Sequence, residues 1–180
     1  MAATVGSLLR PGLLDGARVV LASAEPPSAH GEAVNSRCAA LGARMGRVVV
    51  DPTGDEPPGR AEVDVLVWDG ASLAGPRDVL DGAWLALRPI ARAAWIEPGR
   101  PGKLLLIAPP PCDAGAEAAR AGLENLARTL SIEWARYGIR TAALLPGGAT
   151  APEEVAELVA FLASRAGDYY SGCGFAMGGA

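Results

Sequence analysis

The sequence predicts an α/β fold built on a mostly parallel sheet of about six strands. Three observations lead to this prediction. Short runs rich in Val and Leu alternate along the chain with longer segments of helical period. The runs are apolar at successive positions, which is typical of strands that are buried on both faces. The chain has 180 residues, of which 50% are hydrophobic, and this suits one domain with a sizeable core.

Six short apolar runs, bounded by turn residues or helical patterns, are expected to be strands. They cover residues 18–24, 47–51, 63–69, 103–109, 139–146 and 172–178. Helical patterns occupy residues 28–42, 77–96, 113–137 and 152–165. Because crossovers between parallel strands are right-handed, this order predicts a doubly wound, Rossmann-like sheet. We expect a single truncated domain of this kind over residues 1–180.

One crossover departs from this order. The segment that follows the second strand, 51–63, reads DPTGDEPPGRAEV and holds three prolines and two glycines. Proline has no amide donor and clashes inside a helix, so this segment is predicted to be a loop. The sheet is therefore expected to lack one of its crossover helices.

Composition and charge exclude several classes of protein. The net charge is −4 and the basic residues are scattered, so no nucleic-acid or acidic-membrane surface is expected. The start, MAATVGSLLRPG, lacks the basic region and apolar run of a signal peptide, and charges and a proline interrupt the apolar segment 79–96. Cys38, Cys112 and Cys173 are widely spaced and odd in number, which indicates free thiols in a cytoplasmic protein.

Four segments form a series with a known counterpart. They read VDVLVWDGA (63–71), DGAWLALRPIARAAW (81–95), RAGLENLARTLSIEWARYGIRTAALLPG (120–147) and PEEVAELVAFLASRAGDYYSGCGFAMGG (152–179). This series resembles the short-chain dehydrogenase/reductase (SDR) family, in its 3-oxoacyl-reductase-like branch. The resemblance implies a Rossmann-like fold, an NAD(P) cofactor and the reduction of a carbonyl group.

The family's phosphate-binding loop, TGxxxGxG, falls on residues 22–29, which read ASAEPPSA. In the family these glycines let backbone amides approach the pyrophosphate at the N-terminus of the next helix. Pro26 and Pro27 supply no amide hydrogens, and Glu25 adds a negative charge beside the expected phosphates. We therefore expect no cofactor and no cofactor-binding residue.

Two other cofactor positions also differ. The family's NNAG falls on residues 68–71, WDGA, where Trp68 is expected to crowd the cofactor channel. Asp51 is either the acidic residue that binds a ribose hydroxyl or, in keeping with turn preferences, a residue that ends a strand. On either alternative one strand–helix unit of the family is missing.

The family's catalytic residues are absent. Its asparagine falls on Val79, its serine on Ala108 or Pro109, and its tyrosine and lysine on Ala116 and Arg120. The tyrosine acts as the acid because an adjacent ammonium lowers its pKa. Alanine offers no acid, and arginine holds a ribose but shuttles no proton. The resemblance thus implies no catalytic residue in this chain.

No displaced catalytic pair replaces them. The tyrosines Tyr137, Tyr169 and Tyr170 have no lysine four residues further on, and the only lysine, Lys103, begins a strand. Cys112 lies in the former active-site loop without a histidine or lysine partner nearby in the sequence.

Other polar and aromatic candidates are expected to be structural, and no metal site is predicted. They are the sole histidine, His30; Glu153 and Glu157, on a solvated helix face; and Trp84 and Trp95, in packing roles. The family's substrate lid is also expected to be missing, because PGGATAPEEV passes directly into the last helix.

Three functions remain open. We expect a catalytically inactive protein that acts as a structural or regulatory subunit beside an active SDR homologue, in a hetero-oligomer, or that forms a homo-oligomer. In the family, tetramers assemble chiefly through the two helices that fall on residues 79–96 and 113–137. The alternatives are a divergent NAD(P)-dependent oxidoreductase of carbonyl or 3-oxoacyl substrates, and a small-molecule-binding module that uses the vestigial cleft.

Two helix patterns favour the subunit. Residues 82–96, GAWLALRPIARAAWI, are apolar on almost every face except at Arg88 and Arg92, so a second covering surface is expected. On the later helix an i, i+3, i+4 stripe suits the protein's own sheet; it comprises Ala119, Gly122, Leu123, Leu126, Ala127, Leu130 and Trp134. The residues off this stripe that are expected to face a neighbouring helix are Ala118, Ala121, Ile132 and Ala135.

Overall fold

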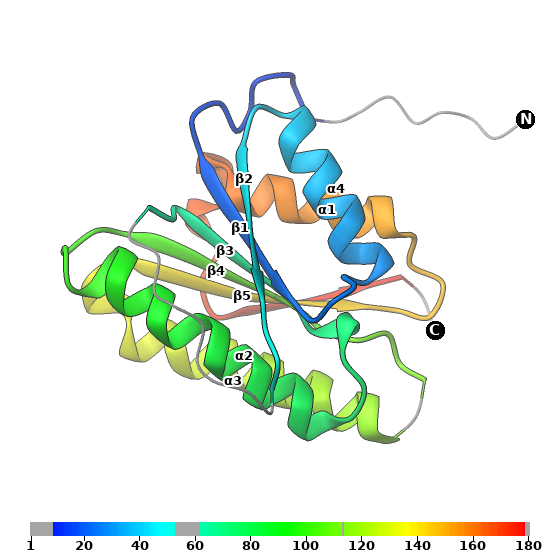
Figure 1. The fold of residues 1–180 in the computed structure, drawn as a ribbon. Coiled ribbons are helices and arrows are strands. Elements are labelled where there is room, and N and C mark those ends of the chain that lie inside the picture. Colours follow the sequence, from blue (N-terminus) through cyan, green and yellow to red (C-terminus); the bar gives the residue numbers. More distant parts are fainter. Residues whose placement is uncertain (1–8, 53–61, 113, 179–180) are drawn as a thin grey trace, which may run out of the picture.

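The computed structural model describes residues 9–52, 62–112 and 114–178, which form a six-stranded parallel sheet with helices on both faces (Figure 1). The sheet order is β2-β1-β3-β4-β5-β6. The strands are β1 (Arg18–Ser23), β2 (Arg44–Val49), β3 (Val65–Asp69), β4 (Gly102–Ile107), β5 (Ile139–Pro146) and β6 (Cys173–Met177). The helices are α1 (Ala29–Ala40), α2 (Pro76–Ile90), α3 (Ala114–Glu133) and α4 (Pro152–Ala163), and the shorter helical turns are η1 (Gly70–Ser72), η2 (Ala91–Ile96), η3 (Ala135–Tyr137) and η4 (Arg165–Tyr169). The predicted α/β, Rossmann-like class is confirmed.

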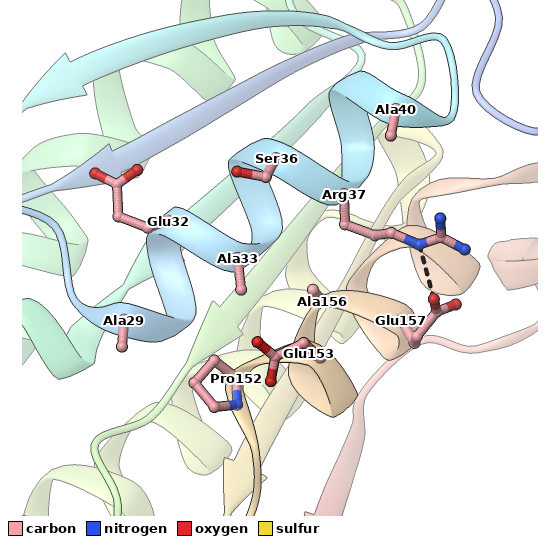
Figure 2. A pocket seen from close by; sticks show the side chains of 10 residues that line it. All are labelled: Ala29, Glu32, Ala33, Ser36, Arg37, Ala40, Pro152, Glu153, Ala156 and Glu157. Carbon is pink, nitrogen blue, oxygen red and sulfur yellow. Dashed lines mark ion pairs between the residues drawn. The ribbon is translucent and has the colours of Figure 1, made fainter. Parts of the chain in front are cut away.

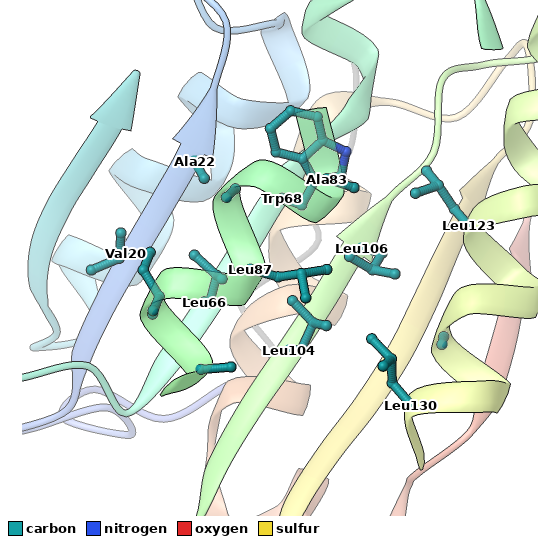
Figure 3. Close-up of a cluster of buried hydrophobic side chains, with 14 of the residues drawn as sticks. Val20, Ala22, Leu66, Trp68, Ala83, Leu87, Leu104, Leu106, Leu123 and Leu130 are labelled. Atoms are coloured by element: carbon teal, nitrogen blue, oxygen red, sulfur yellow. The ribbon is translucent and has the colours of Figure 1, made fainter. Parts of the chain in front are cut away.

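The helices form two layers. α1 and α4 lie side by side on one face of the sheet, and α2 and α3 lie on the other (Figure 1). Side chains of successive strand residues alternate between the two faces. Leu66 and Leu104 belong to the cluster under α2 and α3 (Figure 3), whereas Val67 and Leu105 belong to the cluster under α1 and α4. Both faces of the sheet are therefore core, as the continuous apolar runs predicted.

The second strand begins earlier than expected. It was predicted over 47–51 but pairs with β1 from Arg44 to Val49, with Arg44 opposite Arg18. A glycine turn at Gly42, with a φ of 96°, ends the preceding helical segment and leads straight into the strand. The polar start of β2 lies at the edge of the sheet, where burial does not require an apolar run.

The helix predicted over 77–96 consists of two parts. α2 runs to Ile90, and the chain then widens into the π-helical turn η2, which follows Pro89 inside the helix. A proline removes one amide donor and crowds the preceding turn, which accounts for the change of pitch. In η2 the indole Nε1 of Trp95 donates to the carbonyl of Val63 at 2.8 Å, and the side chain is fully buried. The packing role of Trp95 is confirmed.

The exposed side of this helix is polar over a longer stretch than the two expected exceptions, Arg88 and Arg92. Its exposed side carries Arg77, Asp81, Arg88 and Arg92, which recur at helical spacing and form one polar stripe. Arg77 pairs with Asp81 at 3.3 Å. Trp84 lies in the same stripe and is 43% exposed, so it is not a packing residue of this chain's own core.

The stripe predicted on the later helix faces the sheet as expected. Leu123, Ala127 and Leu130 of α3 are buried against the sheet, whereas Ala118 and Ala121 of the same helix are exposed. The regular helix ends at Glu133 rather than at Tyr137. The 3₁₀ turn η3 follows, and Gly138, with a φ of 71°, then leads into β5.

Two deletions relative to the family pattern concern the loops. Most of the predicted loop 51–63 falls on residues 53–61, outside the described residues, and its described ends carry no helix. Between β5 and α4 only residues 147–151 intervene, so no substrate lid is present there. Within the described ranges no helix is long and apolar enough to cross a bilayer.

Candidate functional site

The candidate site lies at the carboxyl edge of the sheet, where ligands of parallel α/β folds bind. Four segments meet there: the loop 24–28 before α1, the turn η1 after β3, the loop 108–112 after β4 and the turn 147–151 after β5. The first two correspond to the cofactor half of an SDR site. The last two, with α2 and α3, correspond to its catalytic half.

The N-terminus of α1 is closed by Asp69, the last residue of β3. The Oδ2 atom of Asp69 accepts a hydrogen bond from the Ser28 amide at 2.8 Å, and its Oδ1 atom accepts one from the Ser28 hydroxyl at 2.7 Å. Ser28 is the N-cap of α1, and its Oγ atom accepts a bond from the Gly31 amide at 3.2 Å. A negative group of the protein itself thus lies at the positive end of the helix.

This carboxyl group is wholly buried, with 0% of Asp69 exposed. Burial raises the pKa of Asp69, while the two hydrogen bonds from Ser28 and the nearby His30 act in the opposite direction. A Cβ atom on Gly31 would lie 2.3 Å from Oδ2 of Asp69, so only glycine allows the helix backbone to approach the carboxylate this closely. The first turn of α1 therefore packs directly against the carboxyl group of Asp69.

The residues at this helix N-terminus do not fit NAD(P). In the family pattern the pyrophosphate binds at this helix N-terminus, and an anion there would be repelled by the nearby carboxylate of Asp69. Pro26 and Pro27 offer no amide hydrogens in the same loop. The side chain of Glu25 pairs with Arg47 of β2 at 3.1 Å and is more than half exposed.

A second contact fixes the same loop from η1. The Ser72 hydroxyl donates to the carbonyl of Asp69 at 2.6 Å and accepts a bond from the Ala24 amide at 2.9 Å. Asp51, the candidate ribose ligand, is exposed beyond the end of β2. The loops after β1 and β3 are therefore bonded to each other.

Trp68 does not crowd the cofactor channel, contrary to expectation. Its side chain is 1% exposed and lies under α2, where a Cβ atom on Gly82 would come within 2.8 Å of the indole (Figure 3). Trp68 follows Leu66 by two residues, and this spacing places both side chains on the α2–α3 face. Within the described residues its indole Nε1 has no hydrogen-bond partner.

The catalytic positions meet at a cavity of about 280 Å³, here named the cleft cavity. Val79, Pro109 and Ala116, which fall on the family's asparagine, serine and tyrosine, all line it. Ala108, the other candidate for the serine position, is fully buried in the sheet's core. Cys112 also lines the cavity and is exposed. The structure therefore brings the former catalytic positions together as an apolar hollow.

Arg120, at the position of the family's lysine, is bonded to backbone. Its Nη1 atom donates to the carbonyls of Pro109 at 2.8 Å and Pro146 at 2.6 Å, and its Nη2 atom donates to that of Leu145 at 3.4 Å. Its side chain is largely buried and lies 3.7 Å from a carboxylate oxygen of Glu117. The guanidinium joins the carboxyl ends of β4 and β5 and is not free to hold a ribose.

The only lysine lies at the opposite edge of the sheet. Lys103 Nζ donates to the carbonyls of Leu162, Ala163 and Ser164 at the C-terminus of α4, and it pairs with Asp168 at 2.7 Å. Burial lowers the pKa of this ammonium. Lys103 stabilises a helix end, a role that no local sequence pattern signals.

A larger groove, of about 650 Å³, lies between α1 and α4 (Figure 2). Its walls are small side chains such as Ala33 and Ala156, with Glu153 from the start of α4. Glu157 was expected on a solvated face, but it pairs with Arg37 across the groove at 2.7 Å. Nowhere in the described residues do three or more His, Cys, Asp or Glu side chains gather as a metal site would require.

Known proteins resemble this chain in sequence and in fold. No protein-family model matches it. A probable 2,4-dienoyl-CoA reductase of Bacillus subtilis is 34% identical over 136 aligned residues, which cover 56% of this chain and 53% of the relative. The chain thus spans about half the length of this curated relative.

Solved structures share the fold at lower identity. A citronellol catabolism dehydrogenase of Pseudomonas aeruginosa superposes with a TM-score of 0.75 at 20% identity, covering 95% of this chain and 97% of the other. A short chain dehydrogenase of Mycobacterium smegmatis superposes with a TM-score of 0.72 at 22% identity, covering 93% and 94%. Together with the sequence relative, these likenesses confirm the predicted resemblance to the short-chain dehydrogenase/reductase family.

Proposed function

We propose that this SDR-like protein is catalytically inactive and serves as a structural or regulatory subunit paired with an active short-chain dehydrogenase. The observation that carries this proposal is the position of Asp69. Its buried carboxyl group accepts two hydrogen bonds at the N-cap of α1, where the dinucleotide phosphates of an active relative would lie. A carboxylate already bonded at this helix end disfavours the binding of a dinucleotide phosphate there.

The catalytic half supports the same proposal. Carbonyl reduction needs a group that protonates the substrate oxygen, and Val79, Pro109 and Ala116 carry no such group. Arg120 donates hydrogen bonds to backbone carbonyls, and its guanidinium stays charged. It therefore replaces neither the tyrosine nor the lysine.

The outer side of α2 and α3 supports the pairing. Trp84 is 43% exposed and Ile132 is 79% exposed, two of the large apolar side chains that the described surface leaves in water. Ala118 and Ala121 are exposed on the same side of α3 and small enough for a partner helix to approach closely. Burial of a bulky apolar side chain at an interface contributes about 1.5–3 kcal/mol. We place this assembly in the cytoplasm, in keeping with the three free cysteines.

Nucleotide binding tests the loss of cofactor. Isothermal titration of the purified chain with NADH and with NADPH should give no heat of binding at physiological concentrations. Binding of either nucleotide below about 1 mM would instead favour the alternative, a divergent NAD(P)-dependent oxidoreductase of carbonyl or 3-oxoacyl substrates.

Co-expression with an intact SDR from the same organism tests the pairing. Light scattering should show a hetero-oligomer, or a homo-oligomer if the chain pairs with itself. Replacement of Trp84 and Ile132 by Glu should dissociate it. Tyr169→Glu is the matched control, because Tyr169 is 90% exposed but lies on η4, away from α2 and α3. A monomer at high concentration that binds no co-expressed homologue would refute the subunit role.

A further inference from the structure

We infer that the groove of about 650 Å³ between α1 and α4 is the docking site for a short, basic, amphipathic helix of a protein partner. This inference is independent of the proposed subunit role, which uses α2 and α3 on the opposite face of the sheet (Figure 1). The groove, here named the α1–α4 groove, lies along the outer side of the two helices (Figure 2).

The shape of the α1–α4 groove fits a helix. Its lining residues on α1 recur at i, i+4, i+7 and i+11 and therefore share one helix face; they are Ala29, Ala33, Ser36 and Ala40. At 1.5 Å per residue this face extends over about 16 Å, which is about three turns. From α4, the buried Ala156 lines the same groove. Because all these side chains are small, the backbone of a third helix can approach both walls closely.

The groove leaves apolar groups in contact with water. Ala29 and Ala40 are exposed, and Ala33 is half-buried. A helix that places bulky apolar side chains at i, i+4 and i+7 would cover these methyl groups along the whole face, and the removal of apolar surface from water favours association. A compact small molecule would cover only part of it.

The charges beside the groove select a basic partner. Three carboxylates line it, those of Glu32, Glu153 and Glu157, together with one guanidinium, that of Arg37. Arg37 pairs with Glu157 at 2.7 Å at one end, whereas Glu32 and Glu153 lie toward the other (Figure 2). Among the described residues no arginine or lysine pairs with Glu32 or Glu153. Both lie in the first turn of a helix, whose positive end favours their ionised form, so the groove carries excess negative charge.

This charge disfavours the other occupants. In a symmetric contact between two copies, the same carboxylates would face each other across the two-fold axis and repel. Nucleic acids and anionic membranes are repelled in the same way. Lysine or arginine side chains on the border of a partner helix would instead pair with Glu32 and Glu153 while its apolar face covers the alanines.

A pair of peptides tests the inference on the full chain. The probe is a fluorescein-labelled helical peptide of about 14 residues, with Leu at i, i+4 and i+7, Lys on both borders of that face and Ala elsewhere. The control peptide has Glu in place of each Lys. By fluorescence anisotropy the Lys peptide should bind with a dissociation constant below about 1 mM, and the Glu peptide should bind at least about tenfold more weakly. Raising the ionic strength from about 0.05 to about 0.5 M should weaken the binding of the Lys peptide, because salt screens the pairing.

Charge variants separate the groove from the overall acidity of the chain. Glu32→Lys with Glu153→Lys should weaken binding of the Lys peptide about tenfold or more. Asp78→Lys with Glu133→Lys is the matched control, because it changes the net charge equally at exposed residues of α2 and α3 and should leave the affinity within about twofold.

Two tryptophan variants locate the peptide. Ser36→Trp places a bulky side chain in the groove and should abolish binding, whereas Ala39→Trp places the same side chain on an exposed part of α1 outside the groove and should preserve it. If Ser36→Trp fails to fold, as judged by circular dichroism, Ala33→Leu replaces it as the filling variant.

Four outcomes would overturn the inference. They are no binding of the Lys peptide up to about 1 mM, equal binding of the Glu peptide, binding that persists in the filled variant, and equal losses in the two charge variants. Light scattering provides a further check, because a change in the chain's own oligomeric state on replacing Glu32 and Glu153 would mean that a second copy occupies the groove and would also overturn it.

Discussion

The two halves of the carboxyl edge have departed from the SDR pattern in opposite ways. In the cofactor half, around β1, β3 and α1, the N-cap of α1 is bonded to a polar group of the chain itself, the carboxyl of Asp69. In the catalytic half, around β4, β5 and α3, polar side chains have given way to apolar ones, and a hollow of about 280 Å³ is left. Asp69 thus occupies the helix end in the cofactor half, whereas the catalytic half contains a cavity.

The physical reason lies in what each half leaves unsatisfied. A helix N-terminus presents amide donors and a positive end that need a partner whether or not a ligand binds. In this chain the carboxylate of Asp69 is that partner for the N-cap residue of α1. A catalytic side chain, in contrast, is replaced by an alkyl group without exposing any donor or acceptor, and only packing is lost. The cofactor half should therefore resist substitution more strongly than the catalytic half.

The largest effect is expected at Asp69. Asp69→Ala leaves the Ser28 amide and hydroxyl without their buried acceptor. We expect the free energy of unfolding to fall by about 3 kcal/mol, because buried donors that lose a charged partner are costly. Urea denaturation of the purified variant measures this loss.

The matched control for that loss is Asp78→Ala. Asp78 also lies in the first turn of a helix, α2, but it is exposed. An exposed carboxylate at a helix N-terminus contributes about 0.3–1 kcal/mol, so the control should lose far less stability. Equal losses in the two variants would mean that Asp69 contributes only its charge near a helix end and is not a buried ligand of α1.

A smaller effect is expected at Arg120. Arg120→Met removes the donors to the carbonyls of Pro109 and Pro146 and should lower the free energy of unfolding by about 2 kcal/mol. Arg128→Met, on the exposed side of the same helix, breaks an ion pair with Glu124 and should cost about 0.5 kcal/mol. Chemical denaturation of both variants ranks them. If Arg120→Met is as mild as Arg128→Met, the guanidinium does not hold the ends of β4 and β5 together.

The dependence of stability on pH should be subtler still. Burial raises the pKa of Asp69 above its ordinary value of 3.8, so the folded chain binds a proton there more readily than the unfolded chain. The stability that Asp69 contributes should thus be greatest at low pH and should decline as pH rises through the raised pKa. The stability difference between the native chain and Asp69→Asn, measured from about pH 4 to 7, should shrink with rising pH. A difference that grows with pH would show that the hydrogen bonds outweigh burial.

The opposite end of the same strand should behave in the opposite way. Asp64, just before β3, accepts side-chain bonds from Arg18 at 3.0 and 2.9 Å, and these lower its pKa. Its contribution is therefore present above the ordinary pKa and is lost as pH falls. Asp64→Asn serves as the control of opposite sign in the same series.

Most of the fold was predictable from the sequence because it rests on local patterns. The apolar runs and the stripe of Leu123, Ala127 and Leu130 depend only on period, and the structure confirms them. The polar side of α2 was predicted only in part, because Arg88 and Arg92 were expected exceptions whereas Arg77 and Asp81, at the same helical spacing, lie before the segment 82–96. The burial of Trp68 could have been predicted from its spacing. Trp68 follows Leu66 by two residues in a strand, so both side chains lie on the same buried face of the sheet.

The central features of the site were not predictable in this way. The bond between Asp69 and Ser28 joins residues that are 41 positions apart, and the bond of Arg120 to Pro146 spans 26 positions. No local pattern marks either pair, because each forms only when two strand ends meet. The family pattern indicated which catalytic side chains are absent, but what had taken their place required the assembled edge.

The smallest effect is expected from an attempt to rebuild the catalytic pair. Ala116→Tyr with Arg120→Lys restores the family's residue types at both positions, yet we expect no carbonyl reduction. Val79 and Pro109 still offer no polar group beside the tyrosine, Asp69 still closes the cofactor half, and catalytic groups that act as a unit do not recover one at a time. Consumption of NADPH with 3-oxoacyl and simple carbonyl substrates is the assay, with an intact SDR as the positive control and circular dichroism to verify folding. Rebuilding only the catalytic half should leave the chain inert, because Asp69 remains at the N-terminus of α1. Measurable turnover by the native chain or the double variant would show that the cofactor half still binds a nucleotide.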